Sequence, residues 1–292
     1  MTATGATGLG DAPGGSTRSR RQRYERRQRL RSVGIAAAST VLVVTAVVVF
    51  VPKLDGWESV RRSFFDADAF RNVFPELLAP FWYDVQIFLW CAPLIVALGL
   101  LVAIARNLRT PALYPVRLAA IVFTDVVRGI PVILWITLLG FGVPGMLQTR
   151  EWYGGFIIWG SVALVVTYSA YTAEVFRSGI ESVHESQRAA SRSLGLTSAQ
   201  TMRTVVLPQA MRRVVPPSMN LLVSLQKDVA LISILGPVEA LRRAGIENAR
   251  TFNFTPYVAA AVLFLCVSIP LTRITDHLLA RDRRRMSATA VT

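Results

Sequence analysis

The chain has 292 residues, of which 52% are hydrophobic and only 17% are charged. Soluble domains usually carry about 25% charged residues, so this composition excludes an ordinary soluble protein and indicates a membrane protein. The formal net charge of +14 does not indicate a nucleic-acid partner, because the basic residues collect at the chain ends and in two inner loops. That distribution is typical of cytoplasmic flanks that face anionic membrane lipid.

The sequence also argues against a metal centre or a catalytic triad. Cys91 and Cys266 lie inside apolar segments without a histidine neighbour, and His184 and His277 are far apart. Small buried hydrophobic side chains are the usual role of such cysteines. We therefore expect no catalytic residue, no metal ligands and no cofactor bound by this chain.

The first eighty residues contain one long apolar segment. Residues 1–17 are rich in Gly, Ala, Thr and Ser, and residues 18–31 contain eight arginines and one acid. The apolar stretch at 33–51 follows a long basic leader and precedes no clear cleavage site, which favours a retained anchor helix over a signal peptide. We expect a disordered basic cytoplasmic terminus over 1–32, an anchor helix over 33–51 and an external linker over 52–80.

Five further apolar segments are long enough to cross a hydrocarbon core of about 30 Å, which takes about 20 helical residues. They cover residues 85–105, 118–140, 155–175, 214–235 and 257–279. The sequence therefore predicts an all-α integral membrane protein with six transmembrane helices. Residues 81–280 are expected to form its transmembrane domain, and residues 281–292 a cytoplasmic tail.

Positive charge predicts the orientation of the six helices. The N-terminus, the loop after residue 105, the long loop at 181–213 and the tail are rich in arginine, whereas the opposite loops have mixed charge. Basic loops stay in the cytoplasm. We therefore expect both termini to be cytoplasmic.

The long segment at residues 181–213, called the polar loop below, separates two apolar segments. Residues 181–193 contain no Pro or Gly, which predicts a helix. Gly195 is well placed to end it, since glycine adopts positive φ without steric cost. Thr197 or Ser198 can cap a second helix, which Pro208 ends or bends. The pattern predicts a helix–turn–helix elbow below the membrane.

Ionisable groups inside the predicted spans are candidates for a transport pathway, because such groups are costly in lipid. Lys227 and Asp228 lie about 20 Å from the inner end of their span, at 1.5 Å per residue. Adjacent helical residues point in different directions, so we expect the two to have different partners. Lining of a pathway and structural ion pairing both remain open, and Asn220 and Gln226 add polar groups to the same helix.

Another candidate region is the interrupted span near Arg128. Gly129 and Pro131 follow this arginine, and broken helices often build transporter substrate sites. Arg128 has three possible partners: a substrate carboxylate, Asp125 or Glu174. Glu174 and Arg177 are three residues apart, which predicts an ion pair on one helix. Pro216 and Pro217 are expected in the first turn of their helix, where proline is tolerated.

These residues carry a resemblance to a known family. Ala189 and Ala190, followed by Gly195, Leu207 and Pro208, resemble the signature loop of permease subunits in ATP-binding-cassette importers. Flanking residues are similar to the polar amino-acid branch: Arg128-Gly-Ile-Pro131, Tyr171-Thr-Ala-Glu174, Arg177-Ser-Gly-Ile180, Gln187, Pro208-Gln-Ala210, Pro216-Pro217, Asn220 and Lys227-Asp228. The resemblance covers roughly residues 81–279, and the overall look is similar to actinobacterial glutamate permeases.

The resemblance implies a transport subunit of a bacterial cell membrane. The polar loop would be a coupling-helix loop that seats in a groove of a separate ATPase through Gln187, Arg188, Ala189, Ala190, Gly195, Leu207 and Pro208. The implied partners are two ATPase subunits, a second permease subunit and an external solute-binding protein. Glutamate is the first substrate expected. The chain lacks a Gly-x-x-x-x-Gly-Lys phosphate loop, so ATP and magnesium are expected on the partner ATPase rather than here.

The sequence departs from the family pattern at two places. Arg188 replaces the acid of the usual Glu-Ala-Ala, and Ser186 replaces a glycine before Gln187. The change at Arg188 suggests the hypothesis of a matching acidic site on the partner.

Two other functions compete with the importer subunit. An ion-coupled secondary transporter acting alone would need no docking loop. An intramembrane enzyme lacks support, because the sequence has no Gly-x-Ser-x-Gly elbow and no paired histidines.

Overall fold

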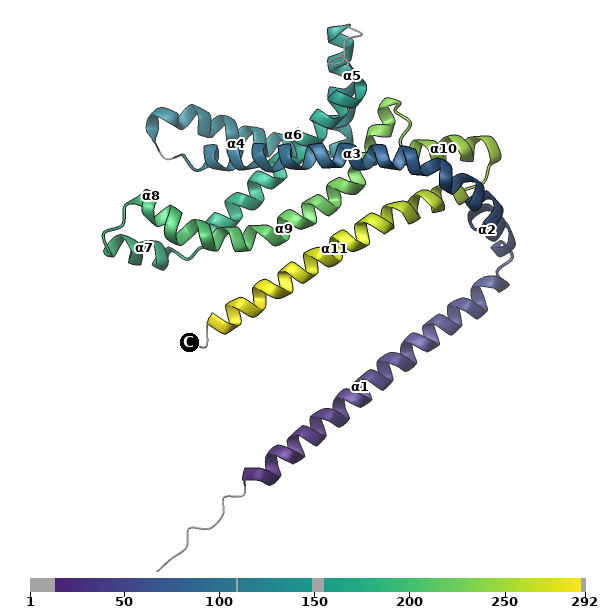
Figure 1. The fold of residues 1–292 in the computed structure, drawn as a ribbon, viewed down its shortest axis with the longest axis horizontal. Coiled ribbons are helices and arrows are strands. Elements are labelled where there is room, and N and C mark those ends of the chain that lie inside the picture. Colours follow the sequence, from purple (N-terminus) through teal and green to yellow (C-terminus); the bar gives the residue numbers. More distant parts are fainter. Residues whose placement is uncertain (1–13, 109, 149–154, 290–292) are drawn as a thin grey trace, which may run out of the picture. The chain divides into compact units, whose positions relative to one another are not determined.

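The computed structural model describes residues 14–108, 110–148 and 155–289, and every regular element within these ranges is helical. The prediction of an all-α fold is therefore confirmed. The chain divides into two compact units, residues 1–62 and 63–292, which are described separately here and drawn in Figure 1.

The first unit is dominated by one long helix, α1 (Gly14–Phe50), which ends in a single turn of 3₁₀ helix, η1 (Val51–Lys53). Within it, the stretch from Arg31 to Lys53 is long and apolar enough to cross a membrane. The structure differs from the predicted disordered terminus, because residues 14–32 already belong to α1. Arginine and glutamine are good helix formers, so the basic run continues directly into the apolar stretch. Residues 1–13 lie outside the described residues.

The second unit starts with the end of α2 (Trp57–Phe64) and contains the remaining helices. These are α3 (Ala67–Arg106), η2 (Pro111–Leu113), α4 (Tyr114–Gly129), α5 (Val132–Leu147), α6 (Phe156–Glu181), α7 (Glu185–Ser193), α8 (Ser198–Thr201), η4 (Met202–Val206), α9 (Leu207–Asp228), η5 (Val229–Leu235), α10 (Ala240–Thr251) and α11 (Thr255–Thr289). Helix α6 packs against α3, α4, α5 and α9, so it is the centre of this unit (Figure 1).

Helix α3 begins well before the predicted span. Asp66 caps its first turn by accepting hydrogen bonds from the backbone N–H groups of Asp68 and Ala69. Val73 and Leu77 on this early part are buried in a cluster that also contains residues of α10 and α11. The compact unit therefore begins at Ser63, whereas the sequence placed residues 52–80 in an external linker.

The predicted span at 118–140 is two helices rather than one. Helices α4 and α5 meet at an angle of 105°, with Ile130 in an extended conformation between them. Pro131 explains the break, because proline lacks an N–H and forces the preceding residue out of the helical region. The predicted interruption of this span near Arg128 is therefore confirmed.

Five helices in the described residues are long and apolar enough to span a membrane, or six if the bent α4–α5 pair counts as one. The predicted spans at 85–105, 155–175, 214–235 and 257–279 lie within or mostly within longer helical segments. Cys91 is buried as expected, but Cys266 is exposed on α11. Large apolar side chains are exposed along α3, α4, α5 and α11, as expected for helices that cross a membrane.

Close packing joins α5, α6 and η5 at the end of α6 that is opposite the polar loop. Leu235 of η5 fits against both Gly140 of α5 and Gly160 of α6. An added Cβ would lie 2.3 Å from the Leu235 side chain at Gly140 and 2.8 Å from it at Gly160. Ile136 and Leu164 are fully buried in the same cluster. Any larger residue at either position would require Leu235 to move.

Candidate functional site

The polar loop folds into the predicted elbow, with one difference at its start. Helix α6 ends at Glu181, and a turn separates it from α7. The predicted continuous helix over 181–193 is therefore wrong. The reason is the His184 ring, which accepts a hydrogen bond from the backbone N–H of Ser186 and so caps a new helix. The predicted stop is confirmed, because Gly195 has φ of +82°.

The second arm of the elbow begins where the sequence indicated but does not end at Pro208. Thr197 and Gln200 form a reciprocal capping box at the start of α8. Helix α8 then continues through the π-helical turn η4 into α9. Pro208 lies in the first turn of α9, where a missing N–H is tolerated. The wider π turn before Pro208 gives its ring room that an α-helical backbone would deny.

The outer surface of the elbow carries small side chains and exposed apolar side chains. Ala189 and Ala190 are exposed, as is Gln187, which accepts a hydrogen bond from Gln209. Leu194 is 82% exposed, immediately before the turn at Gly195. Sequence reasoning missed Leu194. The sequence did contain a signal for its exposure. Leu194 directly precedes the glycine that ends the helix, so no further helical turn follows to cover its side chain. Leu207 and Pro208 are exposed further along.

The inner surface of the elbow is buried against the end of α6. Val183, Val206 and Ala210 form a small apolar cluster. The hydroxyls of Ser191 in α7 and Thr201 in α8 are hydrogen bonded at 3.1 Å, which joins the two arms. The elbow is thus held as a defined shape rather than a loose connector.

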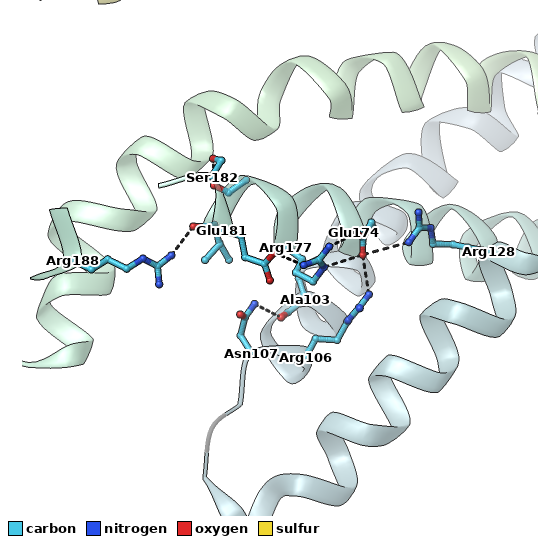
Figure 2. Close-up of polar contacts among 11 residues, drawn as sticks. Ala103, Arg106, Asn107, Arg128, Glu174, Arg177, Glu181, Ser182 and Arg188 are labelled. Atoms are coloured by element: carbon cyan, nitrogen blue, oxygen red, sulfur yellow. Dashed lines mark hydrogen bonds and ion pairs between the residues drawn. The ribbon is translucent and has the colours of Figure 1, made fainter. Parts of the chain in front are cut away.

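Arg188 points inward, toward α6. Its Nη2 donates to the carbonyl oxygen of Ile180 at 2.6 Å, and the side chain is only 17% exposed. Arg213 donates to the neighbouring carbonyl oxygen of Ser182. Figure 2 shows Arg188 reaching back to the last turn of α6. The acid that lies nearest to it is Glu185 of its own helix, with 3.8 Å between Arg188 Nε and Glu185 Oε2.

Glu174 of α6 is the centre of an arginine cluster (Figure 2). Its carboxylate lies 3.0 Å from Arg106 Nη1, 3.4 Å from Arg128 Nη1 and 2.5 Å from Arg177 Nη2. The three arginines come from α3, α4 and α6. Because all three arginines share one carboxylate, ion pairs connect these three helices at a single point. Arg177 also pairs with Glu181.

The cluster shows which residue of the chain pairs with Arg128. Arg128 pairs with Glu174, and its guanidinium lies 5.9 Å from the centre of the Tyr171 ring, a favourable position for a cation. It is also the most exposed of the three arginines, at 36% of the side chain. The predicted ion pair of Glu174 and Arg177 is confirmed.

Lys227 and Asp228 face different surroundings, as expected. Asp228 accepts a hydrogen bond from the Tyr168 hydroxyl of α6 at 2.7 Å. Lys227 is exposed and borders a cavity of about 660 Å³ between α9 and α11, together with Arg273 and Asp276. No ion pair of Lys227 occurs among the described residues.

The other polar residues of α9 differ in burial and do not share one surface. Gln226 is buried and accepts a hydrogen bond from Ser268 of α11, whereas Asn220 is exposed. Pro216 and Pro217 lie inside α9, which begins nine residues earlier at Leu207, so their predicted place in the first turn is wrong. In the part of the chain described, no hydrogen bond or ion pair joins Lys227 or Asp228 to the Glu174 cluster.

Sequence reasoning also missed a buried pair of carboxyl groups. Glu239 caps α10 by accepting from the N–H groups of Leu241 and Arg242, and Asp84 of α3 accepts from the N–H of Ala240 at 3.3 Å. Burial raises the pKa of Glu239. Asp84 and Ala240 are 156 residues apart, so no local pattern indicated the pair. In the described ranges, no group of three or more His, Cys, Asp or Glu residues could hold a metal ion.

Comparison with known proteins identifies the family. Residues 95–284 match the family described as the inner membrane component of binding-protein-dependent transport systems. The chain belongs to this family. It is accordingly a multi-pass inner membrane protein.

Individual relatives agree with this membership. A probable amino-acid ABC transporter permease of Sinorhizobium fredii is 37% identical over 185 residues, covering 61% of this chain and 76% of the relative. A probable glutamine ABC transporter permease of Bacillus subtilis is 30% identical, covering 60% of this chain and 78% of the relative. A crystal structure of an amino acid ABC transporter with histidines matches with a TM-score of 0.64 and 26% identity, over 71% of this chain and 94% of that chain.

Proposed function

We propose that this chain is the permease subunit of an ATP-binding-cassette importer for a polar amino acid, and that the polar loop couples it to a separate ATPase. The observation that carries this proposal is the shape of the elbow: two capped arms meet at Gly195 and expose Ala189, Ala190 and Leu194. Short side chains let another backbone approach closely, and an exposed leucine is an apolar anchor for an interface. The residues proposed to dock are Gln187, Ala189, Ala190, Gly195, Leu207 and Pro208, with Leu194 added.

The proposed assembly contains two copies of the ATPase, a second permease subunit and an extracytoplasmic binding protein. The family description names a binding protein, which supports that partner. One chain forms half of the pathway, and both of its termini are cytoplasmic, so that the polar loop meets the ATPase. ATP and magnesium bind to the partner in this proposal, and this chain contributes no catalytic residue and no metal ligand.

Within the membrane, Lys227 is the best-supported pathway residue. A cation is costly in lipid, and Lys227, which has no ion pair among the described residues, borders a cavity that Arg273 and Asp276 also line. The carboxylate of an amino acid would be an anionic partner for it there. We propose that Lys227 contacts it and that Asp228, Asn220, Arg128 and Glu174 contribute polar groups to the pathway. Lys227→Ala should impair transport more than membrane insertion. Normal uptake by an assembled Lys227→Ala complex would remove this residue from the pathway.

The proposed substrate is glutamate or a similar amino acid. The amino-acid names of the relatives support the class, and Lys227 gives the candidate pathway a cation for a carboxylate.

Purified complex reconstituted with its ATPase and binding protein tests the substrate. ATP hydrolysis should rise when the binding protein is loaded with glutamate. A rise with glutamine or arginine alone would contradict glutamate but keep the class. No rise with any amino acid would contradict the class itself.

A further inference from the structure

The polar-loop end of α6 is held by two arginines that lie outside the helix. Arg188 of α7 donates to the carbonyl oxygen of Ile180, and Arg213 of α9 donates to that of Ser182. The last carbonyls of a helix lack intrahelical partners and carry partial negative charge. Guanidinium groups stabilise such carbonyls, so α7 and α9 are both fastened to the end of α6.

The same end of α6 leads directly into the Glu174 cluster. Arg177 bridges Glu181 and Glu174 along one face of the helix, and Glu174 then pairs with Arg106 and Arg128. Arg128 is the last residue but one of α4, next to the 105° bend. Ion pairs therefore run from Glu181 through Glu174 to Arg128 beside the break between α4 and α5, and α7 is bonded to the same end of α6 at the Ile180 carbonyl (Figure 2).

The geometry argues against a partner acid as the reason for Arg188. Its Nε is fully buried and its Nη2 donates to Ile180, so two of the three guanidinium nitrogens face the interior of the chain. The cavity beside it, about 210 Å³, is lined by Glu185 and Arg192 as well, and those two residues are paired at 2.9 Å. The contacts that Arg188 makes among the described residues are therefore with α6 and with its own helix.

We propose that Arg188 is a positioning residue that fastens α7 to α6, so that a displacement of α7 moves α6 and, through Glu174, the Arg128 end of α4. This inference rests on the proposed function, in which an ATPase displaces the polar loop. It assigns to Arg188 an internal role in place of a contact with the partner.

The experiment compares Arg188→Gln with Arg203→Gln in the reconstituted complex with its ATPase and binding protein. Arg203 is an exposed arginine of the same loop without an ion pair in the described residues, which makes it the matched control. Arg188→Gln should retain the ATPase subunits and hydrolyse ATP, but amino-acid uptake per ATP should fall about tenfold, because a hydrogen bond from a charged group to a carbonyl is lost. Arg203→Gln should match the unchanged protein.

Two more variants keep the test decisive if Arg188→Gln assembles poorly. Arg188→Lys retains a cation that reaches Ile180 and should recover part of the lost uptake. Arg188→Glu places a carboxylate against the helix carbonyls and should lose uptake, whatever charge the ATPase carries.

Unchanged uptake per ATP in Arg188→Gln would overturn the proposal. So would rescue of Arg188→Glu by a reversed charge on the ATPase, since that result identifies a contact with the partner. Failure of the unchanged chain to stimulate or use any ATPase would instead contradict the proposed function, and the two failures are therefore distinguishable.

Discussion

The two ends of α6 are held by different kinds of contact. At the polar-loop end, Glu174 is shared among three arginines on three helices. At the opposite end, Leu235 fills the space that Gly140 and Gly160 leave open, within a fully buried apolar cluster.

The two kinds of contact differ in how much displacement they tolerate. Close-packed interiors have few alternative arrangements, and small shifts create clashes or voids. Guanidinium and carboxylate groups accept several geometries, so a shared carboxylate keeps partners while helices slide. We infer that the apolar end is the fixed end of α6 and that the charged end is the part displaced during transport. The following changes test each end in turn, from the largest expected effect to the smallest.

Removing the charge of Glu174 should have the largest effect. Glu174→Gln leaves Arg106, Arg128 and Arg177 facing one another in a half-buried site, and should lower the free energy of unfolding by about 2 kcal/mol. Uptake by the folded, assembled complex should also fall, beyond any loss caused by a smaller amount of folded protein. Thermal unfolding and transport of the assembled complex measure both. Glu58 also pairs with two arginines, but in the open on α2, so Glu58→Gln should change little. Equal effects of the two substitutions would contradict a special role for Glu174.

Filling the space at Gly140 should disrupt the fixed end. Gly140→Val drives a side chain into Leu235 and should lower the free energy of unfolding by about 2 kcal/mol, as overpacking of a core does. The amount of folded protein after heating measures it. Gly142 lies on the same helix with open space around it, so Gly142→Val is the control. If both valines behave alike, the close packing has no energetic significance.

The bond between α6 and α9 should have an intermediate effect. Tyr168→Phe removes the donor to Asp228 and should lower the free energy of unfolding by about 1.5 kcal/mol, the usual loss for a hydrogen bond to a charged group. Tyr171→Phe keeps the ring beneath Arg128 and serves as the control. Thermal unfolding measures both variants. A Tyr168→Phe protein as stable as the control would show that Asp228 finds another partner.

The carboxyl pair at Asp84 and Glu239 should give the smallest effect, seen only as a pH dependence. The pKa of Glu239 is raised above its ordinary 4.5, chiefly by burial. The folded protein therefore binds this proton more tightly than the unfolded chain, and stability falls as the pH rises above 4.5 through the raised pKa. Glu239→Gln cannot titrate and should flatten this fall, as unfolding measured across pH would show. A slope unchanged from that of the original protein would refute the assignment.

The sequence predicted what depends on neighbouring residues. The long apolar runs, the interruption at Pro131, the stop at Gly195 and the cap at Thr197 all follow from local preferences of the backbone. The Glu174–Arg177 pair follows from helical spacing in the same way.

The sequence did not predict what depends on distant contacts. The early start of α3 is stabilised by α10 and α11, and the pairing of Asp84 with the start of α10 spans 156 residues. The inward direction of Arg188 depends on the carbonyl of Ile180, which becomes available only because His184 starts a new helix. The π turn before Pro208 likewise has no separate sequence signal.

Uptake of a radiolabelled amino acid into liposomes that hold the full complex is the most direct test of ATP-driven import through this chain. The polar-loop face should be supplied with ATP and the opposite face with loaded binding protein. We predict uptake that requires ATP and persists when ionophores collapse every ion gradient. Uptake by this chain alone, driven by an ion gradient without ATP, would contradict the account and restore the secondary transporter.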